Sequence, residues 1–317
     1  MIDVIIPAYN SHKTIERTLF SIAYQVIIDK INVYVVNDCS DKDYSDFVDF
    51  FSKFMDIKEL KLERNSGPGV ARKHGILNSN SKYIVFIDSD DVFYDCFSIK
   101  RLYDAIESSS SSVAIGNFIE EVDNDFCNHK RDNIWLHGKI YRRSFLIDND
   151  INFNDSRANE DNGFNQLIFL CDSSVTYLDF DVYIWCNNLN SITRKNNHSA
   201  LFDLLLGYIY NITWALEEAI HRKCDYSKIA DLSFSSLVAI YCHYLKFIGY
   251  SNAFRIVSLS KKIKKISDSY FLPLDRRLSI LDAQFRSMYD FGSNMCLLEA
   301  TITFNEFLKL IDEVNDD

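Results

Sequence analysis

The sequence lacks the features that mark several large classes of protein. It has no stretch of about 18 consecutive apolar residues, so we expect no transmembrane helix. Its first residues, MIDVIIPAYN, lack the basic start and the longer apolar run of a secretory signal. Basic residues number 34 against 45 acidic ones, which argues against a general electrostatic grip on nucleic acid or anionic lipid. We therefore expect a cytoplasmic protein, although a local basic patch could still bind a polyanion.

Cysteine, glycine and proline carry little information about chemistry. The eight cysteines are scattered and form no CxxC pair, so we interpret them as reduced thiols of a cytosolic protein. Only 9 glycines and 3 prolines occur, beside much Asn, Ile, Phe and Tyr, a composition that suggests an AT-rich bacterial or viral genome. Hydrophobic residues make up 47% of the chain, enough for a sizeable core.

The first third of the chain alternates short apolar runs with helical patterns. The predicted buried strands are Ile2–Pro7, Asn32–Asn37, Lys58–Leu62 and Tyr83–Ile87. Helices are predicted from Thr14, with Ser11 as N-cap, over Tyr44–Met55, and from Gly69 to about Leu77. Repeated strand–helix–strand units predict a parallel sheet with right-handed crossovers.

Polar residues follow several of these strands directly. Tyr9, Asp38 and Asp88–Asp91 all lie at predicted strand ends. Because ligands gather beyond the carboxyl ends of parallel strands, this placement predicts one shared site. Beyond about His198 the pattern changes to long helical segments, which predicts a helical region at the end of the chain. Apolar residues recur at helical spacing over Leu201–Ala219, Ser227–Ile248 and Leu278–Phe291.

The motif Asp88-Ser89-Asp90-Asp91 concentrates negative charge after a hydrophobic strand. Such carboxylates repel one another unless water or a cation relieves the repulsion. Mg²⁺ and Mn²⁺ prefer carboxylate oxygens and often share their shell with substrate phosphates. A solvated turn that caps the next helix is the alternative.

Four segments then occur in a fixed order: VIIPAYN, VVNDCSD, NSGPGVARKHGI and VFIDSDD. The ordered set resembles the family 2 glycosyltransferases, strongly over about residues 1–95 and more weakly over 135–195. The resemblance implies an α/β fold of the GT-A type, a Rossmann-like mixed sheet flanked by helices, here with a C-terminal helical appendage. It implies a catalytic domain over 1–199, with a nucleotide-sugar part over about 1–95 and an acceptor part over about 96–199, followed by a helical region over 200–317.

The same resemblance implies an inverting, metal-dependent transfer of sugar from a UDP-sugar, with Mn²⁺ or Mg²⁺. Pro7, Ala8 and Tyr9 would form the wall of the nucleotide-base site, Asp38 would accept a hydrogen bond from the base, and Arg72 would face the nucleotide. The structural alternatives are a turn proline with a core tyrosine, an Asx turn at Asp38, and an exposed helix arginine.

The aspartates and a lysine take further roles by the same resemblance. Asp88 matches a nucleotide-side carboxylate that would also ligate the metal, and Asp90 matches a metal ligand. Asp91 would ligate the metal, orient a neighbour or cap the next helix. Lys139, in the segment GKIY, would lie beside the donor sugar and acceptor. His137, two residues earlier, decides nothing as a lone histidine.

The segment Asn159-Glu160-Asp161 resembles the family's acidic catalytic motif. In an inverting transferase one carboxylate takes the proton of the attacking hydroxyl. We predict Asp161 as that base and Glu160 as the residue that orients the acceptor or a neighbour, with exchanged roles left open. A surface acidic pair at a helix start is the alternative.

A basic segment completes the predicted site. Arg194, Lys195 and His198 match a flap over the diphosphate, where they would supply positive charge or, at His198, a further metal ligand. A solvated basic loop is the alternative.

The acceptor is open at this stage. A bacterial surface polysaccharide or lipid-linked glycan is the first choice, and hydroxylated bases of viral DNA are an alternative, with the host cytoplasm as the location if the protein is viral. A cationic cluster in the helical region could meet DNA phosphates or the inner face of a membrane, or form a solvated face. Its members are Lys261, Lys262, Lys264, Lys265, Arg276 and Arg277. A nucleotidyltransferase and an inactive nucleotide-binding scaffold are the rival classes, and the oligomeric state stays open.

Overall fold

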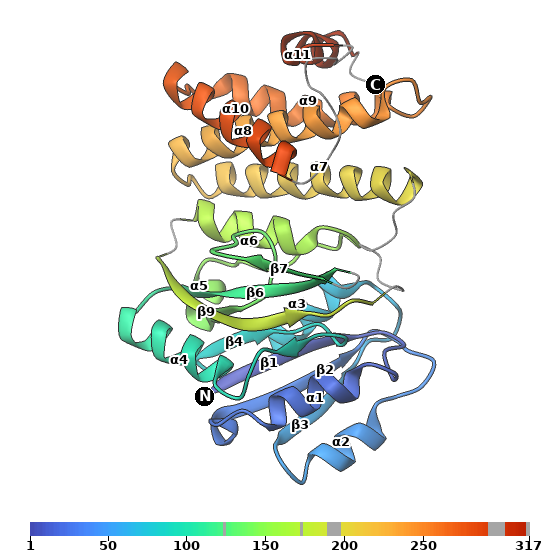
Figure 1. The fold of residues 1–317 in the computed structure, drawn as a ribbon, viewed down its shortest axis with the longest axis vertical. Coiled ribbons are helices and arrows are strands. Elements are labelled where there is room, and N and C mark those ends of the chain that lie inside the picture. The colour runs from blue at the N-terminus through green and yellow to red at the C-terminus, as the bar shows by residue number, and fades with distance from the viewer. Residues whose placement is uncertain (123–124, 172–173, 189–197, 291–301, 315–317) are drawn as a thin grey trace. The chain divides into compact units, whose positions relative to one another are not determined.

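The computed structural model describes residues 1–122, 125–171, 174–188, 198–290 and 302–314 (Figure 1). The chain divides into two compact units. The first comprises Met1–Ile168 and Ser173–Arg194, and the second comprises Phe169–Asp172 and Lys195–Asp317. Each unit is described by itself. The predicted split of the first unit into nucleotide-sugar and acceptor parts concerns function and stays a prediction.

The first unit is built on one mixed sheet of nine strands in the order β3-β2-β1-β4-β8-β6-β9-β5, with β7 paired to β6. The strands are β1 (Ile2–Ala8), β2 (Ile31–Asn37), β3 (Asp56–Lys61), β4 (Tyr83–Phe86), β5 (Val92–Phe93), β6 (Val113–Val122), β7 (Asp125–His129), β8 (Lys139–Arg142) and β9 (Val175–Trp185). β1 pairs in parallel with both β2 and β4, and β2 in parallel with β3. β8 is antiparallel to both β4 and β6. The four predicted strands and the mixed α/β fold are confirmed.

Helices cover both faces of this sheet. Successive side chains of β1 point to opposite faces, and both sets of apolar side chains are buried under helices. Val4 and Ile6 belong to the core that includes Leu19 of α1 (Ile15–Ala23) and Leu102 of α4 (Ser98–Ser109). On the other face, Ile5 packs so closely against Gly75 of α3 (Pro68–Asn78) that a Cβ there would lie 2.4 Å from its side chain. The remaining helices of the unit are α2 (Ser45–Phe51), α5 (Arg143–Asp148) and α6 (Glu160–Leu170), with the short 3-10 helix η1 (Ile28–Lys30).

One local prediction is wrong. Ser11 does not cap α1 with its side chain, because the helix begins after Thr14 and the Ser11 hydroxyl lies 3.0 Å from the Tyr44 hydroxyl. The Ser11 carbonyl instead accepts the backbone N–H groups of Thr14 and Ile15. The backbone therefore provides the bond that was expected from the side chain.

The second unit is helical. It contains α7 (His198–His221), α8 (Tyr226–Tyr244), η3 (Leu245–Phe247), α9 (Phe254–Ser269), α10 (Leu274–Asp290) and α11 (Phe304–Glu313). Buried apolar side chains on α7, α8, α9 and α11 form its interior, including Leu216, Ile240, Ile263 and Phe307. Among the described helices, α7 is long and apolar enough to cross a membrane by length and composition, and 44% of its apolar window is buried within the protein. Core helices of soluble proteins pass the same test, so the prediction of no transmembrane helix stays a prediction.

Candidate functional site

The acidic motif lies in the turn between β4 and β5, where α1 and β9 hold it from two sides. Arg17 and Thr18 of α1 donate hydrogen bonds to the backbone carbonyls of Asp90 and Asp91. The Tyr183 hydroxyl donates to Asp91 Oδ2 at 2.6 Å, and the Cys186 N–H donates to Asp91 Oδ1 at 2.9 Å. Both oxygens of Asp91 are therefore fixed in orientation.

A further contact fixes Asp90. Asn188, which follows β9, donates its side-chain amide to Asp90 Oδ2 at 2.7 Å. The motif is thus a supported turn rather than a freely solvated one. The role predicted for Asp90 as a metal ligand stays a prediction.

The charges of the three aspartates oppose one another. Burial, and then the charge of Asp88, raise the pKa of Asp90. Burial together with Asp88 and Asp90 raises the pKa of Asp91 well above its usual value. For Asp88, burial acts in the same upward direction, but Arg72 and His137 outweigh it and hold its pKa below the usual range. Like charges that face one another in a buried site favour a bound cation.

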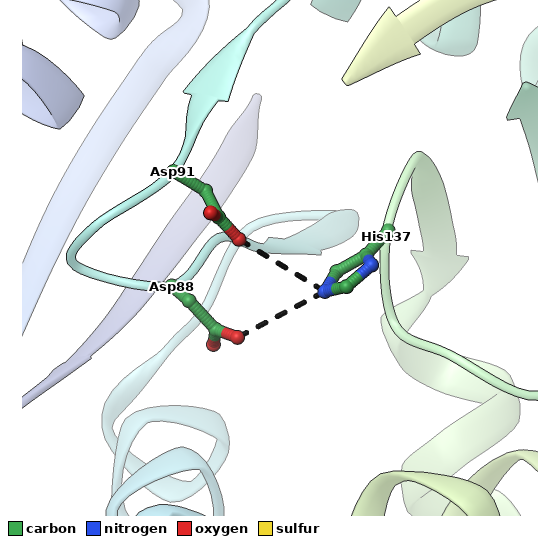
Figure 2. Close-up of side chains that lie close together, drawn as sticks. All are labelled: Asp88, Asp91 and His137. Carbon is green, nitrogen blue, oxygen red and sulfur yellow. Dashed lines mark ion pairs between the residues drawn. The ribbon is translucent and has the colours of Figure 1, made fainter. Parts of the chain in front are cut away.

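His137 joins this group from the loop before β8. Its Nε2 lies 3.9 Å from an oxygen of Asp88 and 3.9 Å from an oxygen of Asp91, as Figure 2 shows. One ligand atom from each of the three residues lies within 4.8 Å of the others. Two carboxylates and an imidazole are established ligands of divalent cations, so the donor set fits such an ion. The sequence analysis could assign His137 no role, because a single histidine has no spacing to interpret.

Arg72 of α3 connects this cluster with the second acidic motif. Its Nη2 donates to Asp88 Oδ1 at 2.7 Å and its Nη1 donates to Glu160 Oε1 at 2.6 Å. The Arg72 side chain is only 5% exposed, so the exposed-helix alternative is wrong. Although burial lowers its pKa, the carboxylates of Asp88 and Glu160 raise it overall, and the guanidinium stays charged.

Glu160 and Asp161 stand in the first turn of α6, and their surroundings differ. Glu160 is buried and ion-paired with Arg72. Gly69 of α3 leaves room for it, because a Cβ on Gly69 would lie 2.9 Å from Glu160 Cγ. Asp161 Oδ1 accepts the N–H of Asn162 at 2.8 Å. Burial, and then the charge of Glu160, raise the pKa of Asp161 to about 7. A surface acidic pair, the alternative reading, is therefore wrong for these two residues.

Lys139, at the start of β8, is fully buried and supports the loop that carries His137. Its Nζ donates to the Trp135 carbonyl and lies 3.6 Å from Asp132 Oδ1. Burial lowers its pKa to about 8. These contacts indicate that Lys139 positions the loop, while its predicted contact with donor or acceptor stays a prediction.

The residues predicted for the nucleotide base lie at the ends of β1 and β2. Pro7 and Ala8 are buried in β1, whereas Tyr9 is 53% exposed and open to a ring-shaped ligand. Asp38 accepts the N–H groups of Ser66 and Gly67, one on each carboxylate oxygen, at 2.7 and 2.8 Å. Asp38 therefore fixes the turn before α3, and its binding of a base stays a prediction.

The basic segment predicted as a flap is described only in part. Arg194 and its neighbour Lys195 fall outside the described residues. His198 begins α7 in the second unit, where its ring stacks on Tyr250 at 3.7 Å between centroids. Its predicted role as a metal ligand stays a prediction.

Most of the predicted cationic cluster is engaged within the second unit. Lys262 pairs with Glu217, Lys264 with Asp268 and Asp312, and Arg276 with Asp231. Lys261 donates to the Val314 carbonyl and Arg277 to the Leu272 carbonyl. The cluster is thus largely balanced by nearby acceptors, which gives no support to a DNA- or membrane-binding surface.

Comparison with known proteins assigns the site to a family. The model of glycosyl transferase family 2 matches residues 3–159, a stretch that contains Asp38, Arg72, Asp88–Asp91 and His137. The chain belongs to family 2 of the glycosyltransferases. It is therefore a glycosyltransferase enzyme, as the ordered motifs predicted.

Relatives of this family 2 enzyme agree in fold and in class. Glycosyltransferase GlyA of Streptococcus pneumoniae is 27% identical over 221 residues, which cover 61% of this chain and 31% of GlyA. Poly(ribitol-phosphate) beta-N-acetylglucosaminyltransferase TarS of Staphylococcus aureus is 28% identical over 199 residues, 57% of this chain and 35% of TarS. The chain thus spans about a third of the length of these relatives.

Solved structures show the same fold at lower identity. Residues 1–349 of TarS in complex with UDP-GlcNAc match with a TM-score of 0.71 and 19% identity, over 96% of this chain and 97% of that one. The mannosyltransferase PcManGT of Pyrobaculum calidifontis, in complex with GDP-Man and Mn²⁺, matches with a TM-score of 0.55 and 13% identity, over 98% of this chain and 85% of that one. These likenesses confirm the GT-A type of fold.

Proposed function

We propose that this glycosyltransferase moves a sugar from a UDP-sugar to a glycan hydroxyl, with inversion and with the help of a divalent cation. The observation that carries the proposal is the continuous set of charged groups from Asp91 and His137 through Asp88 and Arg72 to Glu160 and Asp161. Two ion pairs, Asp88 with Arg72 and Arg72 with Glu160, thus connect the proposed cation site to Glu160, which precedes the proposed base.

Asp88, Asp91 and His137 would hold the cation. A bound divalent ion there would neutralise the negative charge of the departing diphosphate. The Asp88 side chain is 35% exposed, so the cluster is open on the side from which a nucleotide could reach it. The support for UDP as the nucleotide is the TarS fold in complex with UDP-GlcNAc.

Asp161 is proposed as the base that accepts the proton of the acceptor hydroxyl. Its pKa of about 7 suits a general base at neutral pH, because proton transfer is most effective when the pKa lies near the working pH. Glu160 already pairs with Arg72, so it is better placed to orient its neighbours than to take a proton. Arg72 holds Glu160 and Asp88 in fixed positions relative to each other.

The acceptor class is proposed to be a glycan of the bacterial surface. The name of TarS, which transfers N-acetylglucosamine to poly(ribitol-phosphate), supports a surface-polymer acceptor. Hydroxylated DNA bases gain no support, because three of the six residues in the cationic cluster of the second unit form ion pairs within that unit.

Calorimetric titration with UDP in the presence of Mn²⁺, repeated after EDTA, tests the proposal. We expect UDP binding that EDTA abolishes. In a separate transfer assay, we expect release of UDP from UDP-GlcNAc when polyol-phosphate glycans are supplied. Binding of GDP instead of UDP would change the donor and keep the enzyme class. The absence of binding by every nucleotide would favour the inactive scaffold.

A further inference from the structure

The cluster at the end of β4 contains a nitrogen ligand as well as oxygen ligands. Figure 2 shows the His137 ring pointing its Nε2 between the side chains of Asp88 and Asp91. At 3.9 Å from an oxygen of each, this nitrogen is too far for a direct hydrogen bond with either carboxylate. Divalent transition-metal ions bind carboxylate oxygens and imidazole nitrogen, so the three residues together would form a suitable donor set for such an ion.

Aromatic side chains hold the imidazole of His137 in place. The ring stacks on Tyr183 at 4.7 Å between centroids, meets Phe118 edge-on at 5.0 Å and contacts Trp185 at 5.0 Å. The His137 side chain is only 6% exposed. Neighbouring rings on several sides leave the imidazole few other orientations, so Nε2 is aimed at the two carboxylates.

The loop around His137 is fixed as well. The amide of Asn165 donates to the carbonyls of Ile134 and Trp135 at 2.8 and 3.0 Å. Gly138 has a φ of +66°, and a Cβ there would lie 3.1 Å from the Gly116 carbonyl oxygen. This turn therefore requires glycine beside the histidine.

Hydrogen bonding within the described residues does not account for the buried imidazole. Its Nδ1 is buried and has no partner among them. The Nε2 atom faces one oxygen of Asp88 and one of Asp91 at 3.9 Å each, and a cation between the three groups would satisfy all of them.

We propose that His137 is a nitrogen ligand of the cation and makes the site select a first-row transition metal such as Mn²⁺ over Mg²⁺. The inference rests on the proposed function, since it concerns the same cation. Mg²⁺ strongly prefers oxygen ligands and retains its waters, whereas transition metals bind imidazole more readily. The Tyr183 hydroxyl, which donates to Asp91, orients the carboxylate on the other side of the ion.

Pulsed electron paramagnetic resonance of Mn²⁺ bound to the whole chain with UDP provides the test. We expect ¹⁴N modulation from a directly bound imidazole, and its replacement by a ¹⁵N pattern when the protein is labelled with ¹⁵N-histidine. His137→Gln should remove the signal. His74→Gln on α3, in the same unit, is the matched control and should leave it unchanged.

Competition titrations give a second measurement. Wild type should bind Mn²⁺ more tightly than Mg²⁺, and His137→Gln should reduce that preference by about 10-fold, the usual effect of weakening a metal's ligand shell. Failure of Mn²⁺ to bind in the presence of UDP would overturn the proposed function and this inference together. Mn²⁺ binding without a histidine nitrogen signal would overturn this inference alone. The labelled wild type decides the point even when His137→Gln does not fold.

Discussion

The buried carboxylate of Asp3 and the carboxylates after β4 lie at opposite ends of neighbouring strands in the first unit, and they differ in how their charge is balanced. Asp3, at the start of β1, is fully buried and accepts hydrogen bonds from Asn32, Ser81 and the Asn80 N–H, all at 2.7–2.9 Å. Its donors are all neutral. The carboxylates after β4 instead face one another, and the pKa of Asp91 is raised by burial and by those neighbours.

The contrast separates a structural carboxylate from functional ones. A buried charge that receives a full set of hydrogen bonds stabilises one local conformation. Buried charges of the same sign that are left facing each other lower stability, and they persist where a ligand relieves them. The comparison predicts that changes at Asp3 lower stability, whereas changes at the carboxylates that face one another alter binding and catalysis without lowering stability.

The largest effect is expected at the acidic pair of α6. Asp161→Asn removes the proposed base, so kcat should fall by about 10³-fold while UDP binding is retained. Transfer assays with calorimetry of UDP binding measure the two quantities. Asp155→Asn, an exposed carboxylate in the same unit, serves as control. Normal transfer by Asp161→Asn would remove Asp161 from the role of base.

A large loss of stability is expected at the residue that joins the two acidic motifs. Arg72→Met leaves Asp88 and Glu160 without their counter-charge, and unfolding free energy should fall by about 3 kcal/mol. Urea denaturation measures the change. Lys82→Met breaks an exposed pair with Glu107 and should cost less than about 1 kcal/mol. Equal losses in both variants would contradict the view that Arg72 is a buried link.

The raised pKa of Asp161 makes a separate prediction about pH. The folded protein holds this proton up to about pH 7, whereas an unfolded carboxyl loses it near pH 4, so the stabilisation is complete below about pH 4 and is lost progressively as pH rises to about 7. The unfolding free energy of Asp161→Asn should therefore exceed that of wild type by more at pH 8 than at pH 5, with the difference widening by on the order of 2 kcal/mol. Thermal unfolding at the two pH values measures this, and a constant difference would show that the Asp161 pKa is ordinary.

At the other end of the strands, Asp3→Asn should lower the unfolding free energy by about 2 kcal/mol. The amide NH₂ of asparagine would face hydrogen-bond donors whose bonds the Asp3 carboxylate accepts in the wild type. Metal-dependent UDP binding should stay unchanged, since the residue lies at the other end of the strands. Chemical denaturation and calorimetry on the same samples test both statements. Weakened UDP binding by Asp3→Asn would contradict the distinction between Asp3 and the carboxylates after β4.

The smallest stability change is expected for Asp90→Asn. The substitution removes one of the repelling charges and keeps an oxygen for Asn188, so unfolding free energy should change by less than about 0.5 kcal/mol. Affinity for UDP with Mn²⁺ should nevertheless fall by about 10-fold, because the local negative charge is reduced. Unchanged metal-dependent binding would remove Asp90 from the site.

The sequence predicted the parts of the fold that depend on local pattern. Apolar runs and helical spacing identified β1–β4 and α1–α3, and parallel pairing followed from their alternation. The antiparallel insertion of β8 between β4 and β6 could not be predicted, because it depends on pairing between distant segments. Helix α9 was not recognised, since its lysines dominate the local composition although Ile256, Val257 and Ile263 are buried.

The site shows the same limit. The motifs at Asp88–Asp91 and Glu160–Asp161 were found from their residues, but the link between them through Arg72 is a property of the folded chain. His137 was missed because its partners come from a different strand end. Asn188 and Tyr183 were missed for the same reason, since β9 brings them beside the motif only in three dimensions.

The bare Cα of Gly69 has a consequence for how the protein tolerates change. Any added side chain would meet Glu160 Cγ at 2.9 Å and the Asn154 carbonyl oxygen at 3.0 Å, while Glu160 is held by Arg72 and cannot swing aside without breaking that pair. In a saturation library selected for transfer, this codon should be restricted to glycine, whereas codon 249, whose Cβ would meet nothing within 4 Å, should accept asparagine. The packing of α3 against Glu160 of α6 therefore limits which substitutions the enzyme can accumulate at position 69.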